Sequence, residues 1–265
     1  MHTLLRRHLL PIQAYFDFSL VLTYAFPQDI LQPLLPPGLS LNTYDGFGFL
    51  ALAMVQTREL RPTFLPKALG QRFFLTGYRI FVCYHTQSGR RLRGLYILRS
   101  DADQASMVIL GNLLTSYGYH KAEVDCSRTD QMLTIAVKTP QAKADVQVIA
   151  DLSTRPASLP TKSPFPDLRI ARQFAGPLPF TFSYESETQS MLRVEGVRQN
   201  WKPEPIHVDV VQATFLHQPP FNQFSEPKLA NAFYLEHIPY RWKRGVREEL
   251  RTTARPLQEE GIPYA

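Results

Sequence analysis

A lysine at the start of a predicted strand is the side chain in this sequence best suited to covalent chemistry. Lys121 follows Gly118 and Tyr119 and opens an alternating segment that runs to Cys126. A lysine amine attacks carbonyl compounds to form a Schiff base when its surroundings keep it neutral. The same lysine can instead be an ordinary solvated strand residue, so its role depends on which strand face meets water.

Strand alternation divides residues 119 to 126 into two faces. Tyr119, Lys121 and Glu123 share the polar face, whereas His120 and Ala122 lie on the other. If the apolar face packs into a core, the lysine points to water. If the polar face lines a cavity, desolvation favours the neutral amine, and the carboxylate beside it either opposes this or shuttles a proton. A lysine that simply binds an anion is the third alternative.

Two arginines are further candidates for contact with an anion. Arg79 lies between Tyr78 and Ile80 in a strand-like segment. A charge among apolar neighbours needs a partner or water, so Arg79 is either an edge residue or an anion ligand in a cavity. Arg198 lies in a polar segment that ends at Trp201. It either clamps a carboxylate or stacks on the indole in a turn.

No cofactor or metal site is predicted. His207 and Asp209 form the only close histidine–carboxylate pair on one strand face, and no third ligand can be named. The two cysteines, Cys83 and Cys126, lie far apart and form no CxxC pair, as expected of free thiols in a reducing compartment. A glycine-rich phosphate loop, a serine nucleophile elbow and an HExxH motif are all missing, which argues against nucleotide-dependent and common hydrolase chemistry.

Composition limits the kinds of partner. The chain has 265 residues, 44% hydrophobic content and a net charge of +6. Its densest basic cluster, residues 90 to 93, follows a Ser-Gly pair and is typical of a solvated hairpin turn rather than a nucleic-acid patch. Any anionic-polymer binding would rest on net charge alone. We expect no signal peptide, and no apolar run approaches the roughly 20 residues of a membrane helix. We expect a cytoplasmic protein with a small-molecule ligand and neither nucleic-acid nor membrane partner; homo-oligomerisation stays open.

Strand-forming segments dominate the chain, with few helices. Strands are predicted at 18–26, 48–56, 78–84, 94–99, 207–215 and 231–236, and hairpins pair 132–137 with 146–152 and 180–183 with 191–197. Helices are predicted near 28–35 and 104–117, and the longest loop near 153–166. No linker divides the sequence, so we expect one domain over residues 1–265 with its core at about 15–240. Many strands with few short helices suit a closed or half-closed barrel, which removes exposed edges.

The order of these elements resembles the acetoacetate decarboxylase-like superfamily. The matching motifs are Leu34-Leu35-Pro36-Pro37-Gly38-Leu39, Tyr44-Asp45-Gly46 and Gly118-Tyr119-x-Lys121. Residues 78–82, 93–101 and 111–114 are more similar to its YqjF-like branch, domain of unknown function 2071. The resemblance covers about residues 15–240. It implies a mainly β fold, an antiparallel, cone-like β-barrel whose central cavity binds or transforms a small oxo or carboxylate compound.

The catalytic motif of the superfamily is only partly present. In its decarboxylases a proline and two lysines follow the aromatic residue, and the first lysine forms the Schiff base. Lys121 matches that lysine, but His120 replaces the proline and Ala122 the second lysine; the acidic residue expected after the strand tyrosine is also missing. Acetoacetate decarboxylation itself is therefore not expected. The resemblance implies a Schiff-base activity or ligand binding without catalysis, with these site residues: Lys121 and Glu123 as catalytic groups, and Tyr78, Arg79, Tyr119, His120 and Arg198 around the substrate.

Overall fold

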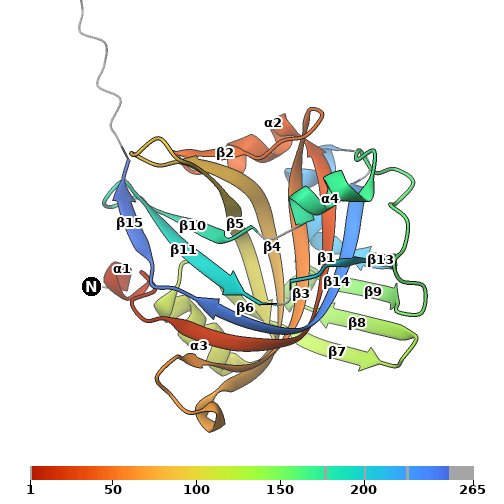
Figure 1. Cartoon of the computed structure of the whole chain (residues 1–265), viewed down its shortest axis with the longest axis horizontal. Helices are drawn as coiled ribbons and strands as arrows, with labels where there is room; N and C mark the ends of the chain where they lie inside the picture. Colours follow the sequence, from red (N-terminus) through yellow and green to blue (C-terminus); the bar gives the residue numbers. More distant parts are fainter. Residues whose placement is uncertain (1, 176–177, 200, 225–226, 251–265) are drawn as a thin grey trace, which may run out of the picture.

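Two β-sheets form the framework of the computed structural model, which describes residues 2–175, 178–199, 201–224 and 227–250 (Figure 1). Within these residues the larger sheet has eleven strands: β1 (Ile12–Pro27), β2 (Leu39–Leu41), β3 (Phe47–Pro62), β4 (Gln71–His85), β5 (Arg91–Ala102), β6 (Tyr119–Lys121), β10 (Phe180–Glu185), β11 (Ser190–Arg198), β12 (Glu204–Pro205), β14 (Lys228–Trp242) and β15 (Val246–Glu249). The smaller sheet has four: β7 (Glu123–Arg128), β8 (Met132–Lys138), β9 (Val146–Asp151) and β13 (His207–Ala213).

Short helices connect and cover these sheets. The α-helices are α1 (His2–Leu5), α2 (Gln28–Leu31), α3 (Ala105–Leu114) and α4 (Leu168–Ala175), and 3₁₀ turns occur at Gln32–Leu34, Lys67–Leu69, Pro140–Ala142, Thr214–His217 and Phe221–Gln223. The predicted helix near 28–35 is thus α2 with its 3₁₀ turn, and the one near 104–117 is α3. No helix in the described part of the chain is long and apolar enough to cross a membrane.

The larger sheet curls into a ring. Its order is β12-β14-β1-β3-β4-β5-β10-β11-β15, with β2 on β4 and β6 on β5, and β11 pairs again with β14. The contacts that complete the ring are short, because β5 with β10 and β11 with β14 pair over three residues each. Two of the pairings, β5 with β10 and β5 with β6, are parallel. The mainly β prediction is confirmed, and it is corrected in two respects: the sheet is mixed, and because the two pairings that complete the ring are so short, the ring is not a true closed barrel.

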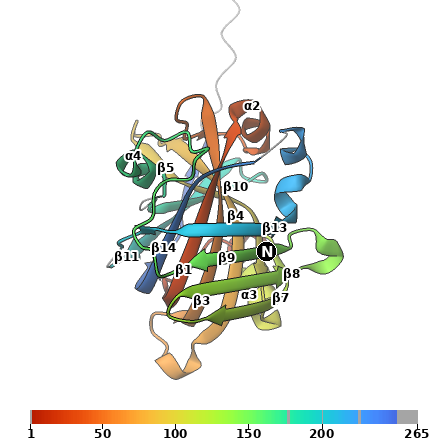
Figure 2. The same cartoon turned by 90° about the vertical axis from the view of Figure 1, so that its right-hand side faces the viewer.

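Each long strand separates two environments, because its side chains alternate between faces. On β3, Leu52 faces outward and packs with Ile80 of β4 and Ile135 of the smaller sheet. That sheet crosses the outer face of the larger one (Figure 2). The predicted hairpin of β8 and β9 is confirmed. Burying a large apolar side chain stabilises the fold by about 1.5–3 kcal/mol. Most of the buried apolar side chains belong to the cluster on the outer face, so this face carries the main core.

The inner face of the larger sheet is covered at one end by α4. Ala171 of this helix and Phe165 before it pack against Phe49 of β3 and Phe81 of β4. The Asp167 carboxylate accepts a hydrogen bond of 2.8 Å from the backbone N–H of residue 170, which satisfies a free donor at the start of the helix. Sequence analysis did not predict this helix. At the other end, α3 packs against β4 and β5.

Candidate functional site

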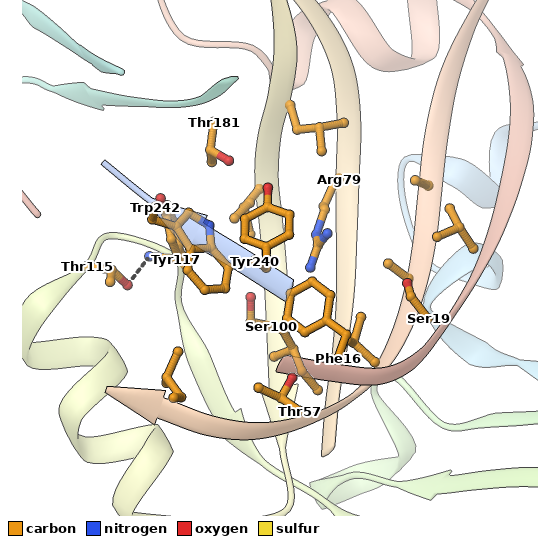
Figure 3. A pocket seen from close by; sticks show the side chains of 18 of the residues that line it. Phe16, Ser19, Thr57, Arg79, Ser100, Thr115, Tyr117, Thr181, Tyr240 and Trp242 are labelled. Atoms are coloured by element: carbon orange, nitrogen blue, oxygen red, sulfur yellow. Dashed lines mark hydrogen bonds between the residues drawn. The ribbon is translucent and has the colours of Figure 1, made fainter. Parts of the chain in front are cut away.

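A cavity of about 170 Å³ lies on the inner face of the larger sheet (Figure 3). Its wall is built from alternate residues of β1, β3, β4 and β5, closed by side chains from α3, β6, β10, β11 and β14. Several inward positions hold small residues, among them Ser19, Ala51 and Ala53, each nearly fully buried. Small side chains on a curled sheet leave space that the core does not fill.

Arg79 points into this cavity from β4 (Figure 3). Gly77, two residues earlier on the same face, leaves room for the guanidinium, since a Cβ there would lie 3.1 Å from Nε. That Nε has no hydrogen-bond partner. Burial lowers the pKa of Arg79, while Tyr240, Tyr119 and Tyr117 act in the opposite direction. An arginine stays protonated even so, and Arg79 is therefore a cation with an unused donor inside the cavity.

A second arginine reaches the cavity from the end of β11. The guanidinium of Arg198 lies 4.2 Å from the ring centre of Trp201 and donates a hydrogen bond to the carbonyl oxygen of Leu178. Burial lowers the pKa of Arg198, and the positive charge of Arg79 lowers it further. The predicted stacking of Arg198 on the indole is therefore observed, and Arg198 also lines the cavity; its role as a carboxylate clamp stays a prediction. Among the described residues on the cavity wall there is no carboxylate, so the site favours an anion.

Tyr119 is fixed in the wall by α3. A Cβ at Gly111 would come within 2.4 Å of the tyrosine ring, so the helix approaches β6 closely only because this residue is glycine. The side chain of Asn112 then pairs with the backbone of Tyr119, accepting one hydrogen bond and donating another, each of 2.8 Å. Burial raises the pKa of Tyr119 to about 12. Its phenol is therefore a neutral hydrogen-bonding group near neutral pH.

His8 is a cavity residue that sequence analysis missed. Its ring lies 5.4 Å from that of Tyr117, and neither ring nitrogen has a hydrogen-bond partner. Burial lowers the pKa of His8 to about 4. The preceding residue anchors the segment, since the Arg7 guanidinium donates two hydrogen bonds of 2.8 Å to the Glu185 carboxylate. The N-terminal segment gives no periodic signal that would reveal these long-range contacts.

The structure gathers Arg79, Tyr119 and Arg198 at the cavity and places the other predicted site residues elsewhere. Tyr78 faces the outer core, with its ring centre 4.1 Å from that of Phe215. Adjacent residues of a strand point to opposite faces, so Tyr78 and Arg79 cannot both line the cavity.

Lys121, His120 and Glu123 are exposed. The Lys121 ammonium donates to the carbonyl oxygens of Asp103 at 2.7 Å and Ala122 at 3.0 Å, outside the cavity. The reason is the length of β6, which ends at Lys121, so the chain leaves the wall and Glu123 begins a strand of the smaller sheet. Of the alternatives for Lys121, this geometry favours the solvated one.

Other polar groups near the sheet do not belong to the cavity. Arg99 and Asp101 form an ion pair of 2.7 Å on the outer face, with the carboxylate fully buried. His207 and Asp209 stand on β13, at the edge of the smaller sheet. Among the residues that the structure describes, no group of three or more His, Cys, Asp or Glu side chains is arranged to hold a metal ion.

The fold is similar to solved structures of acetoacetate decarboxylase-like proteins. Acetoacetate decarboxylase from Legionella pneumophila aligns with a TM-score of 0.59 and 11% identity over 89% of this chain and 86% of that one. An acetoacetate decarboxylase-like enzyme from Sphingomonas wittichii RW1 gives 0.57 and 14% over 92% and 94%. The enduracididine biosynthesis enzyme MppR, complexed with the condensation product of pyruvate and imidazole 4-carboxaldehyde, gives 0.54 and 11% over 89% and 88%. These likenesses establish the acetoacetate decarboxylase-like fold.

A family model narrows the class further. The model described as an uncharacterised conserved protein, domain of unknown function 2071, matches residues 14–239. The chain therefore belongs to this family, and the resemblance predicted from the sequence motifs is confirmed. No curated protein matches the sequence at a significant level.

Proposed function

We propose that this protein binds a small organic anion, a carboxylate or oxo acid, in the inner cavity, with Arg79 as the principal contact. The observation that carries the proposal is the unpartnered guanidinium Nε of Arg79 in a cavity whose described wall has no carboxylate. A charge removed from water is costly unless it is paired. A bound anion supplies that pairing, and Arg198, which also lines the cavity, adds a second positive charge.

The structural neighbours support a small-molecule ligand of this kind. MppR has been solved with pyruvate and with a pyruvate condensation product. The present cavity lies inside a fold of the same class, and the guanidinium of Arg79 provides a cation that can pair with the carboxylate of a bound acid. No lysine occurs among the described residues of its wall. We therefore propose non-covalent binding rather than a Schiff base.

Calorimetric titration with pyruvate, acetoacetate and benzoate tests the anion site. Losing one partner of a buried charge pair costs at least about 2 kcal/mol, so Arg79→Gln should weaken binding of any acid that binds by about 30-fold or more. Arg72→Gln is the matched control, because Arg72 lies on the same strand, is 73% exposed and faces Asp17 at 3.5 Å. Equal affinity of the Arg79 variant and the wild type would refute the proposal.

The covalent alternative has its own experiment. The protein is incubated with pyruvate or acetoacetate, reduced with borohydride and digested, and the peptides are weighed by mass spectrometry. We expect no adduct specific to Lys121, because its ammonium is exposed and bonded to two backbone carbonyls. An adduct that Lys121→Ala abolishes would establish a Schiff base and overturn non-covalent binding.

A further inference from the structure

The cavity wall around the two arginines is mostly apolar. Phe16, Phe73, Leu75, Phe81 and Ile97 all face the space into which Arg79 projects. A short hydrophilic acid would fill only the charged end and leave these side chains against void or water. Apolar cavities bind apolar groups readily because their walls gain dispersion contacts that water does not replace well.

One side of the cavity is an aromatic wall. The ring of Tyr240 stacks on Phe16 with centroids 4.9 Å apart and lies 4.4 Å from Trp242 (Figure 3). Gly196 on the neighbouring strand allows this position, because a Cβ there would fall 2.1 Å from the Tyr240 hydroxyl. Aromatic faces favour flat or edge-on partners at centroid distances of about 4.5–7 Å. The wall is thus suited to a ring or a compact branched chain.

The volume of the cavity limits which ligands fit. The cavity measures about 170 Å³, slightly more than the roughly 150 Å³ of an apolar protein cavity that accommodates benzene. A six-carbon ring or a branched chain of similar bulk fits, with the carboxylate at Arg79.

From these three features, and resting on the proposed anion site, we infer that the ligand is a compact hydrophobic carboxylic acid. It carries one acid group for Arg79 and an aromatic or branched aliphatic body of about six carbons for the apolar wall. Short hydrophilic acids such as pyruvate are weak ligands of this site, because they leave the aromatic wall unused.

Calorimetric titration of the full chain with matched probes tests this inference. Each buried methylene tightens binding about fourfold, so 4-methyl-2-oxopentanoate, with three more carbons than pyruvate, should bind at least about 30-fold more tightly. Phenylacetate should also bind more tightly than pyruvate. The matched alcohol 4-methylpentan-1-ol should bind more weakly than 4-methylpentanoate. If pyruvate binds as tightly as the larger acids, the inference about the hydrophobic body is wrong, whereas the proposed anion site at Arg79 is not contradicted. No acid binding, or equal binding of the alcohol, would overturn both.

Filling the cavity provides a second test. Ala53 lines it from β3 and is 2% exposed, so Ala53→Leu should remove the preference for 4-methyl-2-oxopentanoate over pyruvate. Val55→Leu, a smaller increase at a second wall position, replaces this variant if Ala53→Leu does not fold. Arg72→Gln again serves as the control. A filled cavity that binds the larger acid as tightly as the wild type would show that the body binds elsewhere.

Discussion

The unpartnered histidine in the cavity makes acid stability a sensitive test of the structure. Burial lowers the pKa of His8 from 6.5 to about 4. One pKa unit corresponds to 1.36 kcal/mol between the two protonation states, so the proton costs the folded protein about 3 kcal/mol more than the unfolded chain. A base with a depressed folded pKa is protonated first in the unfolded state. The unfolding free energy is therefore unaffected by His8 above about pH 6.5, and it falls as the pH drops from 6.5 toward 4.

Urea denaturation at pH 7 and pH 5 measures this effect. Between these values the wild type should lose about 2 kcal/mol of unfolding free energy through His8 alone. His8→Asn should remove that part of the pH dependence. Asparagine is the suitable replacement because it does not titrate and tolerates the positive φ of 48° at this position.

Carboxylates also change the stability of the protein between pH 7 and pH 5, and a matched variant separates their effect from that of His8. Burial opposes ionisation of Glu185, but its bonds to Arg7 outweigh burial and lower its pKa, so its stabilising effect also fades in acid. Wild type and His8→Asn share this group, and their difference isolates the histidine. His85→Asn, the same substitution at an exposed histidine of β4, is the matched control. The same slope in wild type and His8→Asn would refute the burial of a neutral imidazole.

Two further predictions concern a buried charge without a partner and a buried charge in an ion pair. Arg79→Met removes an unpaired cation and should raise the unfolding free energy by about 1–3 kcal/mol in urea while weakening anion binding; a destabilised variant would show that the guanidinium has a protein partner. Asp101→Asn leaves Arg99, whose side chain is 12% exposed, without its counter-charge. It should cost about 3–5 kcal/mol by the same measurement, and a loss below about 1 kcal/mol would show that water replaces the carboxylate.

Local signals in the sequence were sufficient for most strands but not for the ring that they form. Alternation and turn residues predicted the hairpin of β10 and β11, which is confirmed. The parallel pairing of Phe180–Phe182 with Gly94–Tyr96 leaves no local pattern, because it joins segments more than 80 residues apart. Helix α4 was missed, although Asp167 ahead of an amphipathic run is a recognisable helix start.

In the candidate site, too, adjacent sequence points to some residues of the cavity wall, whereas the residue that was missed depends on contacts distant in the sequence. Arg79 was predicted because a charge between apolar strand neighbours needs an explanation, and that argument uses adjacent residues alone. Lys121 was grouped with Tyr119 by strand period, but it is the last residue of β6, and its ammonium donates to the carbonyl oxygens of Asp103 and Ala122 outside the cavity. His8 reaches the cavity through its anchored neighbour Arg7, whose partner Glu185 lies 178 residues away.

The two faces of the larger sheet explain how the fold tolerates such a cavity. Outward residues such as Leu20, Leu52 and Ile80 are fully buried against the smaller sheet, so most of the apolar stabilisation does not depend on the inner face. The inner face can then retain an unpaired arginine and an uncharged histidine, each of which lowers stability on its own. Natural proteins keep such groups where function requires them. Changes at inward positions should therefore alter ligand binding first, whereas changes at the outward positions beside them should alter stability first.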